Sequence, residues 1–180
     1  MRTKIEVKSV HKGFVTKTGS LDVVEGVSFT VGDGELVAIV GPSGCGKTTL
    51  MSVLRGANEG SVTGTVAVNG VVMNGEGLAR LQCALGFVPQ EDVLDRALTV
   101  RELLDFNARM RLPASTTAGA RAAIVARVMT DLNLHGIANT VIGGGTNLAA
   151  NISGGQLKRV NVAVELVAQP AALFLDGASR

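Results

Sequence analysis

The chain of 180 residues has no tryptophan, no tyrosine and only five phenylalanines. Domains that bind single-stranded nucleic acid stack bases on several aromatic rings, so this shortage argues against that function. The formal net charge is +2, and the lysines and arginines are scattered along the chain. DNA- and RNA-binding proteins usually carry a dense basic surface. We therefore expect no nucleic-acid partner.

Long apolar runs are also missing. The mean hydropathy is +0.34, but no uncharged apolar stretch approaches the roughly 20 residues that cross a bilayer. The N-terminus alternates polar and apolar residues and lacks the core of a signal peptide. The two cysteines, Cys45 and Cys83, form no metal-binding pattern and indicate no disulfide framework. The expected location is the cytosol, free or beneath a membrane partner.

Apolar residues make up 46% of the chain, which favours a packed fold. Apolar runs predict strands at residues 5–10, 27–31, 35–40, 65–68, 85–88 and 172–175, with the one at 35–40 buried. Capping signals and helical spacing predict helices at residues 47–56, from Thr99 to a break at Pro113, at 118–132 and at 154–168. Turns are expected at residues 18–20 and 32–34, and a loop at 135–152. This order predicts an α/β core with a helical insertion.

A glycine-rich segment matches the pattern G-x-x-x-x-G-K-[ST], which is typical of phosphate loops. It comprises Gly41, Pro42, Ser43, Gly44, Cys45, Gly46, Lys47 and Thr48, followed by Thr49. Its glycines let backbone N–H groups turn toward phosphate oxygens, and the following helix adds its positive end. Lys47 would reach the β- and γ-phosphates of ATP, and the Thr48 hydroxyl would bind Mg²⁺. The alternative is a glycine turn that only precedes a helix.

A second segment has the character of an anion site. Ser153 can cap the predicted helix, and Gly154 and Gly155 leave bare N–H groups at its positive end, before Gln156. An ordinary serine cap with a flexible approach would look the same. The sequence leaves both interpretations open.

Two further residues are candidates for metal chemistry. Asp176 ends the apolar strand at residues 172–175, where a carboxylate of a phosphate-loop protein would hold Mg²⁺, usually through water. Gln90 directly follows the stretch at 87–89. Taken alone, Asp176 could simply end a strand and Gln90 could be a turn residue.

Four segments in this order, GPSGCGKTT, VPQ, ISGGQ and LFLD, resemble the ATPase domain of an ATP-binding cassette (ABC) transporter. The segments at 87–94, 98–102 and 159–166 are similar to subfamily G, the White-type half-transporters. The resemblance covers residues 5–176 and implies a phosphate-loop NTPase (RecA-like) core with an antiparallel β subdomain and a helical insertion. The chain would be one incomplete nucleotide-binding domain. It would comprise a β subdomain and phosphate-loop part (1–88), a helical subdomain (89–153), and a signature helix with the strand before Asp176 (154–180).

The resemblance implies roles for the candidate residues. Gln90 would sense Mg²⁺ and couple to the membrane part, and Thr48, Gln90 and Asp176 would hold the metal. Residues 153–156 would form the signature loop, which closes on ATP held by a second nucleotide-binding domain. Phe14 would stack on adenine, although a phenylalanine at a strand end is more often part of the core. The implied partner is a transmembrane domain, which would place the chain at the cytoplasmic face of a membrane.

The sequence departs from the family after Asp176. Gly177 stands where the family has a glutamate that polarises the attacking water, and losing such a base costs about 10²–10⁴-fold in rate. The family's D-loop and switch histidine do not follow. His11 and His135 precede Asp176 and are expected to be ordinary surface or loop residues. We therefore expect a C-terminally truncated domain, whether a fragment, a truncated gene model or a degenerate paralogue.

Two functions remain open at this point. The first is an ATPase domain that powers export through a transmembrane domain. The alternative is a hydrolysis-deficient ATP-binding module for regulation or dimerisation, which Gly177 favours. A soluble ABC protein acting on ribosomes or DNA fits the charge balance poorly. The transported substrate, the membrane and the pairing of domains are not encoded here, and the transcript beyond the codon for Arg180 would separate the two functions.

Overall fold

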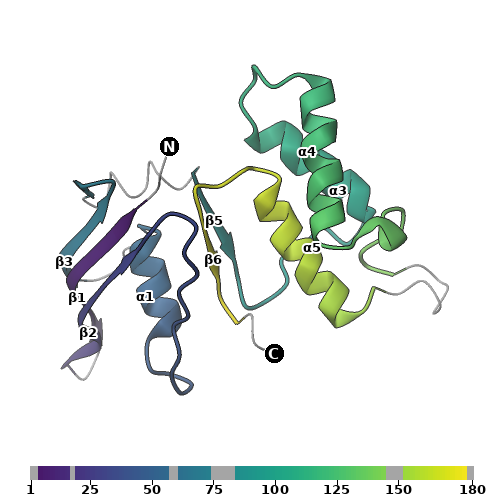
Figure 1. Cartoon of the computed structure of the whole chain (residues 1–180). Helices are drawn as coiled ribbons and strands as arrows, with labels where there is room; N and C mark the ends of the chain where they lie inside the picture. Colours follow the sequence, from purple (N-terminus) through teal and green to yellow (C-terminus); the bar gives the residue numbers. More distant parts are fainter. Residues whose placement is uncertain (1–3, 17–18, 57–60, 74–83, 145–151, 178–180) are drawn as a thin grey trace. The chain divides into compact units, whose positions relative to one another are not determined.

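The computed structural model describes residues 4–16, 19–56, 61–73, 84–144 and 152–177 (Figure 1). Cys83, part of the turn expected at 18–20 and part of the loop expected at 135–152 lie outside the described residues. The chain divides into two compact units, Met1–Leu85 and Gly86–Arg180. The fold is mixed α/β, as the sequence predicted.

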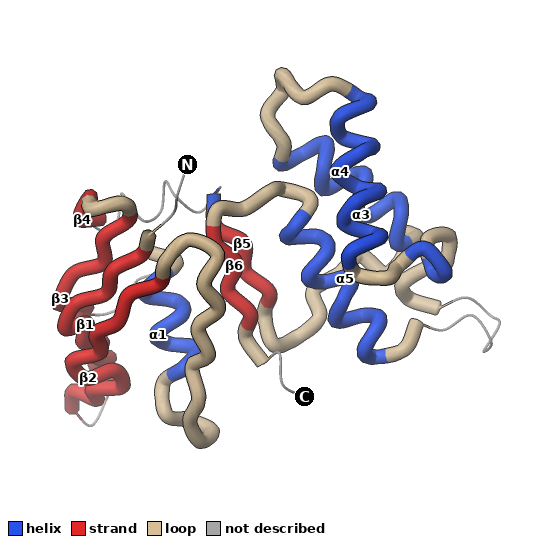
Figure 2. Tube along the Cα trace, in the orientation of Figure 1, coloured by secondary structure: helices blue, strands red, loops and turns tan. Residues whose placement is uncertain are grey.

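The first unit is built on a four-stranded antiparallel sheet, drawn as red tubes in Figure 2. The strands lie in the order β2 (Gly19–Val31), β1 (Ile5–Thr16), β3 (Ser61–Val68) and β4 (Val71–Met73). Ile5 pairs with Val31 on one side and with Val68 on the other. The predicted strands at 5–10, 27–31 and 65–68 are confirmed, and each lies within a longer strand.

Among the described residues of the first unit, the helix α1 (Lys47–Leu54) packs against β1 and β2. It buries Leu50, Val53 and Leu54, while the sheet contributes Val7 and Val10 to the buried residues. The helix ends just before Gly56, which has φ +78°. A glycine adopts this conformation without a steric penalty and so ends helices readily. The predicted helix at 47–56 is confirmed.

The strand predicted at residues 35–40 is wrong. These residues form no strand, and Leu36 and Val40 are 92% and 90% exposed. A strand requires a hydrogen-bonded neighbour, whatever its apolar content. No described residue pairs with this segment in the sheet, whose edges are β2 and β4. The turn predicted just before it is confirmed, since Glu35 N donates to Gly32 O over 3.1 Å.

In its described residues, the second unit combines three α-helices with a strand pair, whose first strand begins at Leu85, the last residue of the first unit. Strands β5 (Leu85–Val88) and β6 (Ala172–Leu175) lie side by side (Figure 2). Two contacts between them show that they run in the same direction. Gly86 lies against Leu173 near their starts, and Asp176 N donates to Val88 O over 2.9 Å at their ends. Both strands agree with the prediction. Because parallel strands carry the chain out at one edge, the residues that follow β5 and β6 meet there.

The helices of this unit are α3 (Val100–Arg111), α4 (Ala118–Asp131) and α5 (Gly154–Leu166), with a 3₁₀ turn η2 (His135–Ile137) in the predicted loop. Thr99 caps α3 with the expected capping box, and Pro113 follows its end. The packed interior holds side chains from all three α-helices, including Val100, Leu104, Met129, Val160 and Val167. The predicted helices at 99–113, 118–132 and 154–168 are confirmed to within two residues.

Candidate nucleotide-binding site

The phosphate loop, residues 41–49, folds back on its own lysine. Lys47 Nζ donates to the main-chain oxygens of Gly41 over 2.9 Å and of Pro42 over 2.8 Å, and lies 3.8 Å from Cys45 Sγ. Gly44 and Gly46 have φ +82° and +92°. L-residues avoid that region because Cβ approaches the following carbonyl. The two glycines therefore allow the turn that brings the ammonium of Lys47 to the main-chain oxygens at the start of the loop.

The start of α1 is open to an anion. Its N-cap is Gly46, which offers no side chain to the first N–H groups. Among the described α-helices it differs in this respect from α3, α4 and α5, which are capped by the hydroxyls of Thr99, Thr117 and Ser153. Free N–H groups and the helix dipole attract phosphate. Thr48 and Ser43 are exposed beside this end, so the loop has the donors that a polyphosphate requires.

The loop also lies close to the strand pair that carries Phe14. A Cβ added to Gly46 would stand 2.7 Å from the carbonyl oxygen of Val23 in β2. The neighbours of Val23 pair with β1, where Phe14 pairs with Leu21. The Phe14 ring is half-buried, and the Nζ atom of Lys12 lies 5.0 Å from its centroid. Phe14 thus lies on the strands adjoining the phosphate loop, as a residue that stacks on the base of a nucleotide would.

Gln90 and Asp176 meet in the second unit, at the edge where β5 and β6 end. Asp176 is half-buried, and no hydrogen bond or ion pair of its carboxylate is found among the described residues. A Cβ built on Gly177 would lie 2.8 Å from Cγ of Gln90. Two residues that the sequence separates by 86 positions, 90 and 176, are therefore close neighbours.

These groups fit Mg²⁺ by their chemistry. Mg²⁺ prefers oxygen ligands and keeps several waters, so one carboxylate and one amide oxygen at a strand edge are suitable donors. The hydroxyl of Thr48, in the first unit, is likewise an oxygen donor. In the part of the chain that is described, no group of three or more His, Cys, Asp or Glu side chains is placed to hold a metal by itself. A metal at Asp176 would therefore need oxygen atoms from ATP or water.

The segment at 153–156 begins α5 with a complete capping box. Ser153 Oγ accepts from Gln156 N over 3.3 Å, and Gln156 Oε1 accepts from Ser153 N over 2.9 Å. Gly154 and Gly155 are exposed, and a Cβ on either would meet nothing within 4 Å. No acidic residue lies in the first turn. The capping role of Ser153 is thus present, and space remains at the glycines for an anion.

Sequence reasoning missed three residues beside Gln90. Lys158 and Asn161 of α5 hold Asp92, and Lys158 also donates to the main-chain oxygen of Gln90. Their spacing along α5, three residues, would place them on one helix face. Only the fold shows that this face meets the segment after β5.

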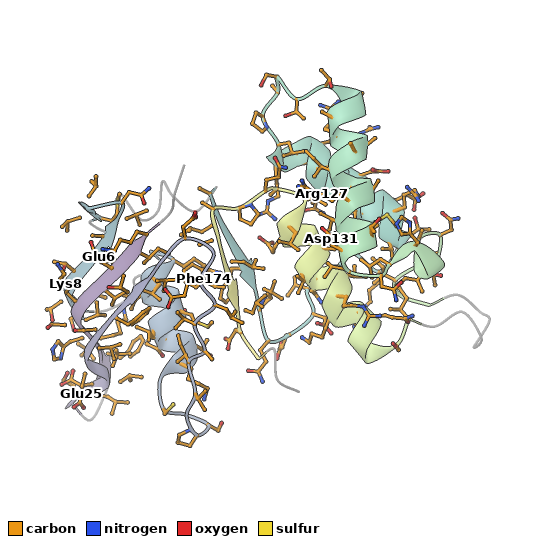
Figure 3. All side chains as sticks on the ribbon, in the orientation of Figure 1. Glu6, Lys8, Glu25, Arg127, Asp131 and Phe174 are labelled. Atoms are coloured by element: carbon orange, nitrogen blue, oxygen red, sulfur yellow. The ribbon has the colours of Figure 1, made fainter. Side chains whose placement is uncertain are left out.

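Other polar groups form no comparable arrangement. Arg127 and Asp131 lie one turn apart on α4 and border a shallow hollow with Leu166 and Pro170 (Figure 3). A binding pocket usually encloses its ligand with several convergent polar groups, which this open hollow does not. His11 accepts from Gly26 N over 3.2 Å, and His135 contacts Thr130 Oγ1 at 2.9 Å. Both histidines are exposed, as expected.

No helix within the described ranges is long and apolar enough to cross a membrane.

Comparison with known proteins gives a consistent result. The family model described as ABC transporter matches residues 24–180. The chain is 43% identical over 154 residues to ABC transporter G family member 21 of Arabidopsis thaliana, covering 86% of this chain and 22% of the relative. It is 40% identical over 175 residues to G family member 14 of the same plant, covering 97% of this chain and 26% of the relative.

A bacterial relative and a solved structure extend the comparison. An ABC transporter ATP-binding/permease protein of Mycobacterium tuberculosis is 38% identical over 161 residues, covering 89% of this chain and 18% of that protein. The structure of a bacterial Atm1-family ABC exporter with ATP bound matches with a TM-score of 0.71 and 26% identity, over 98% of this chain and 29% of that one. The chain thus spans about a quarter or less of the length of these curated relatives.

Proposed function

The chain belongs to the ABC transporter family as an ATP-binding domain of the G-family type, and from that premise we propose that it binds Mg-ATP, and hydrolyses it slowly, as the ATP-binding domain of a system that exports a substrate across a membrane. The observation that carries the proposal is the open start of α1, where Gly46 supplies no cap and Lys47 lies at the mouth of the loop. Backbone N–H groups and an ammonium together suit the β- and γ-phosphates.

We assign the remaining contacts to ATP by their chemistry. When phosphate enters the loop, Lys47 exchanges the oxygens of Gly41 and Pro42 for phosphate oxygens, which are charged and form stronger hydrogen bonds. The rest of the loop, residues 41–49, donates backbone N–H groups. Phe14 stacks on the adenine ring. The Nζ atom of Lys12 lies 5.0 Å from the centroid of the half-buried Phe14 ring.

The metal is proposed to take oxygen donors from Thr48, Gln90 and Asp176. Bound Mg²⁺ neutralises charge that develops on the phosphates. Asp176 would hold it directly or through water, and the carboxamide oxygen of Gln90 would be a further ligand or would bind a water on the metal. Within the described ranges the half-buried carboxylate of Asp176 has no hydrogen bond or ion pair, which supports this assignment, because a half-buried charge without a partner favours a cation.

The partners are proposed from the same site. Ser153, Gly154, Gly155 and Gln156 present an open helix start, which suits the γ-phosphate of an ATP held by a second nucleotide-binding domain. A transmembrane domain, in the same or a separate chain, would receive the motion and provide the export path. The mycobacterial relative is named as an ATP-binding/permease protein, a combination of those two parts. The domain would then lie at the cytoplasmic face of a membrane.

Turnover by this chain is proposed to be slow. A general base must lie within hydrogen-bond reach of the attacking water. Gly177 has no side chain, and the space beside it is filled by Gln90. A carboxamide can orient water but does not accept its proton at neutral pH. ATP would bind, and phosphate would be released slowly.

Calorimetric titration of the chain with Mg-ATP tests the binding. The variant Lys47→Ala should weaken binding by at least about tenfold, the value of one hydrogen bond to a charged group. Lys8→Ala is the matched control, since Lys8 is an exposed lysine of β1 in the same unit (Figure 3). Equal affinity of Lys47→Ala and the unchanged chain would contradict the proposal.

Release of phosphate tests the turnover separately. We expect the rate of the unchanged chain to be close to the background measured with Lys47→Ala. A rapid release that disappears in Lys47→Ala would show that water is activated without a carboxylate at position 177.

A further inference from the structure

The segment that follows β5 is tied to α5 by three short polar contacts. Lys158 Nζ donates to the main-chain oxygen of Gln90 over 2.6 Å and lies 2.7 Å from Asp92 Oδ1. Asn161 Nδ2 donates to the same carboxylate oxygen over 2.6 Å. All of these residues belong to the second unit. The path of the chain from Gln90 to Asp92 is therefore set by two side chains of one helix.

These contacts are stronger than an ordinary surface ion pair. Asn161 is 5% exposed, and the side chains of Asp92 and Lys158 are 25% and 36% exposed. Partial burial and a shared acceptor strengthen charge-assisted bonds, whereas fully exposed pairs contribute little. Asn161 Nδ2 also donates to Leu157 O over 3.2 Å within α5, which fixes the orientation of its amide. The helix thus presents a preformed pair of donors.

The contact to Gln90 has a consequence for its side chain. With its carbonyl oxygen held by Lys158, Gln90 places Cβ and Cγ against Gly177, next to Asp176. The carboxamide is then kept at the edge where β5 and β6 end. Without the bond, the exposed Gln90 would lose one of the restraints on its backbone. Outer-sphere groups of this kind commonly orient metal ligands.

We propose that Lys158 is a positioning residue which, with Asp92 and Asn161, holds Gln90 in place for the Mg²⁺ of bound ATP. Lys158 lies two residues after the segment 153–156 on the same helix. The start of α5 and the metal-facing residue are therefore linked by one side chain. This inference rests on the proposed function, because it assigns Gln90 to the metal.

A purely structural role would have a different signature. In that case Lys158 would only hold α5 against the segment that follows β5. Its loss would lower the thermal stability of the chain without changing how strongly the binding of ATP depends on Mg²⁺. The chain offers a matched control for this possibility. Arg111 Nη2 of α3 and Glu165 Oε2 of α5 form a second partly buried pair, at 2.8 Å, and Glu165 lies toward the end of α5, beyond Lys158.

The experiment compares the affinity of the full chain for ATP with Mg²⁺ and with EDTA, and reports the ratio of the two Kd values. The variants are Lys158→Met, which keeps the apolar part of the side chain but removes the charged amino group, Lys158→Arg, and the control Arg111→Met. Gln90→Ala shows the ratio when the metal-facing side chain is absent. Thermal unfolding of each variant is recorded alongside.

Lys158→Met should reduce the Mg²⁺-dependent gain in affinity about tenfold, as loss of an outer-sphere partner does, and leave binding in EDTA unchanged. Lys158→Arg should restore it, because the charge and donors return. Arg111→Met should lower thermal stability without altering the ratio. Should Lys158→Met fail to fold, Asp92→Asn decides by the same ratio, since it weakens the Lys158 pair but keeps an acceptor for Asn161.

Two outcomes would overturn the inference and can be told apart. If Gln90→Ala lowers the ratio and Lys158→Met does not, Gln90 faces the metal without help from Lys158. If Gln90→Ala itself leaves the ratio unchanged, Gln90 has no metal role and there is nothing for Lys158 to position. In the second case the proposed binding of nucleotide is still judged independently, by Lys47→Ala.

Discussion

The side chain of Gln90 lies directly against the backbone of Gly177. A Cβ built at position 177 would be 2.8 Å from Cγ and 3.2 Å from Cβ of Gln90. Gly177 also has φ +67°, a region that costs an L-residue about 1–2 kcal/mol. Two separate restrictions, one steric and one conformational, therefore favour glycine here. A glutamate could not be introduced at this position without moving Gln90.

Gly177→Ala is predicted to lower the free energy of unfolding by about 2 kcal/mol or more, because backbone strain and the contact with Gln90 add. In the background Gln90→Ala, the same substitution should cost less, because the contact with Cγ is gone, while the backbone strain of about 1–2 kcal/mol and the weaker contact with Cβ of residue 90 remain. Urea unfolding of the four proteins measures both values. Equal costs in the two backgrounds would mean that the chain near Gly177 shifts to avoid Gln90.

Gly46→Ala is predicted to damage the phosphate loop more than Gly44→Ala. Both glycines have positive φ, so both variants carry a strain of about 1–2 kcal/mol. The Cβ at 46 would also meet the carbonyl oxygen of Val23 at 2.7 Å, whereas nothing lies within 4 Å of a Cβ at 44. Urea unfolding and titration with Mg-ATP should rank the variants in this order. A lower stability of Gly44→Ala would contradict the role given to β2.

Arg111→Met is predicted to destabilise the chain by about 1–2 kcal/mol, the range of a charge-assisted pair that is partly shielded from water. The guanidinium contacts both oxygens of Glu165, at 2.9 and 2.8 Å. Glu165 also accepts from Phe87 N over 3.2 Å, which joins α5 to β5. Its carboxylate would remain half-buried without a cation.

The control for this change is Arg109→Met, since Arg109 is exposed on the same helix, α3. Its effect should stay within about 0.5 kcal/mol. Thermal or urea unfolding distinguishes the two. A cost for Arg109→Met as large as that for Arg111→Met would indicate a general effect of charge on α3.

Thr99→Ala is predicted to cost about 1 kcal/mol, the usual value of a lost N-cap. The hydrogen bonds from the backbone N–H of Thr99 and then from its hydroxyl hold the pKa of Glu102 below its usual 4.5. A carboxylate with a lowered pKa adds stability above 4.5, and this stability is lost as the pH falls through the lower, folded-state pKa. The free energy of unfolding should therefore decrease as the pH falls below 4.5 and through the folded-state pKa of Glu102.

The pH dependence separates the two partners of this cap. In Thr99→Ala the decline below pH 4.5 should be shallower, because the hydroxyl no longer bonds to Glu102. In Glu102→Gln the contribution of this group should vanish altogether. Urea midpoints measured from neutral pH down to about pH 3 would show this. An identical pH profile in all three proteins would mean that Glu102 titrates no differently in the folded chain.

Local signals in the sequence were sufficient for most elements. Thr99, Pro113 and Ser153 mark helix ends through bonds or steric limits that involve only residues nearby in the chain, so spacing reveals them. Strand β4 was missed although Asn69 and Gly70, with φ +52° and +80°, form a two-residue connection from β3. Asn-Gly is a strong hairpin signal, and attention to that pair would have predicted the fourth strand.

The strand predicted at residues 35–40 shows the opposite case. Its apolar composition was read correctly, but a strand exists only where another strand accepts and donates its hydrogen bonds. That partner is a property of the whole fold. The same holds for the three contacts made by Lys158, Asn161 and Asp92, which join segments about 70 residues apart in the sequence. The separation of two residues along the chain does not show how close they lie in the folded structure.

The sequence by itself determined the residues of the phosphate loop, the capped start of α5 and the aspartate after β6, because each depends on chemistry carried by a few adjacent residues. The tertiary structure decided which of them become neighbours. It placed Gln90 against Gly177 and Val23 against Gly46, and it tied Gln90 to Lys158. These relationships depend on strand pairing and helix packing between segments that are distant in the sequence. Burial and hydrogen bonding favour one such arrangement over others only when the whole chain folds.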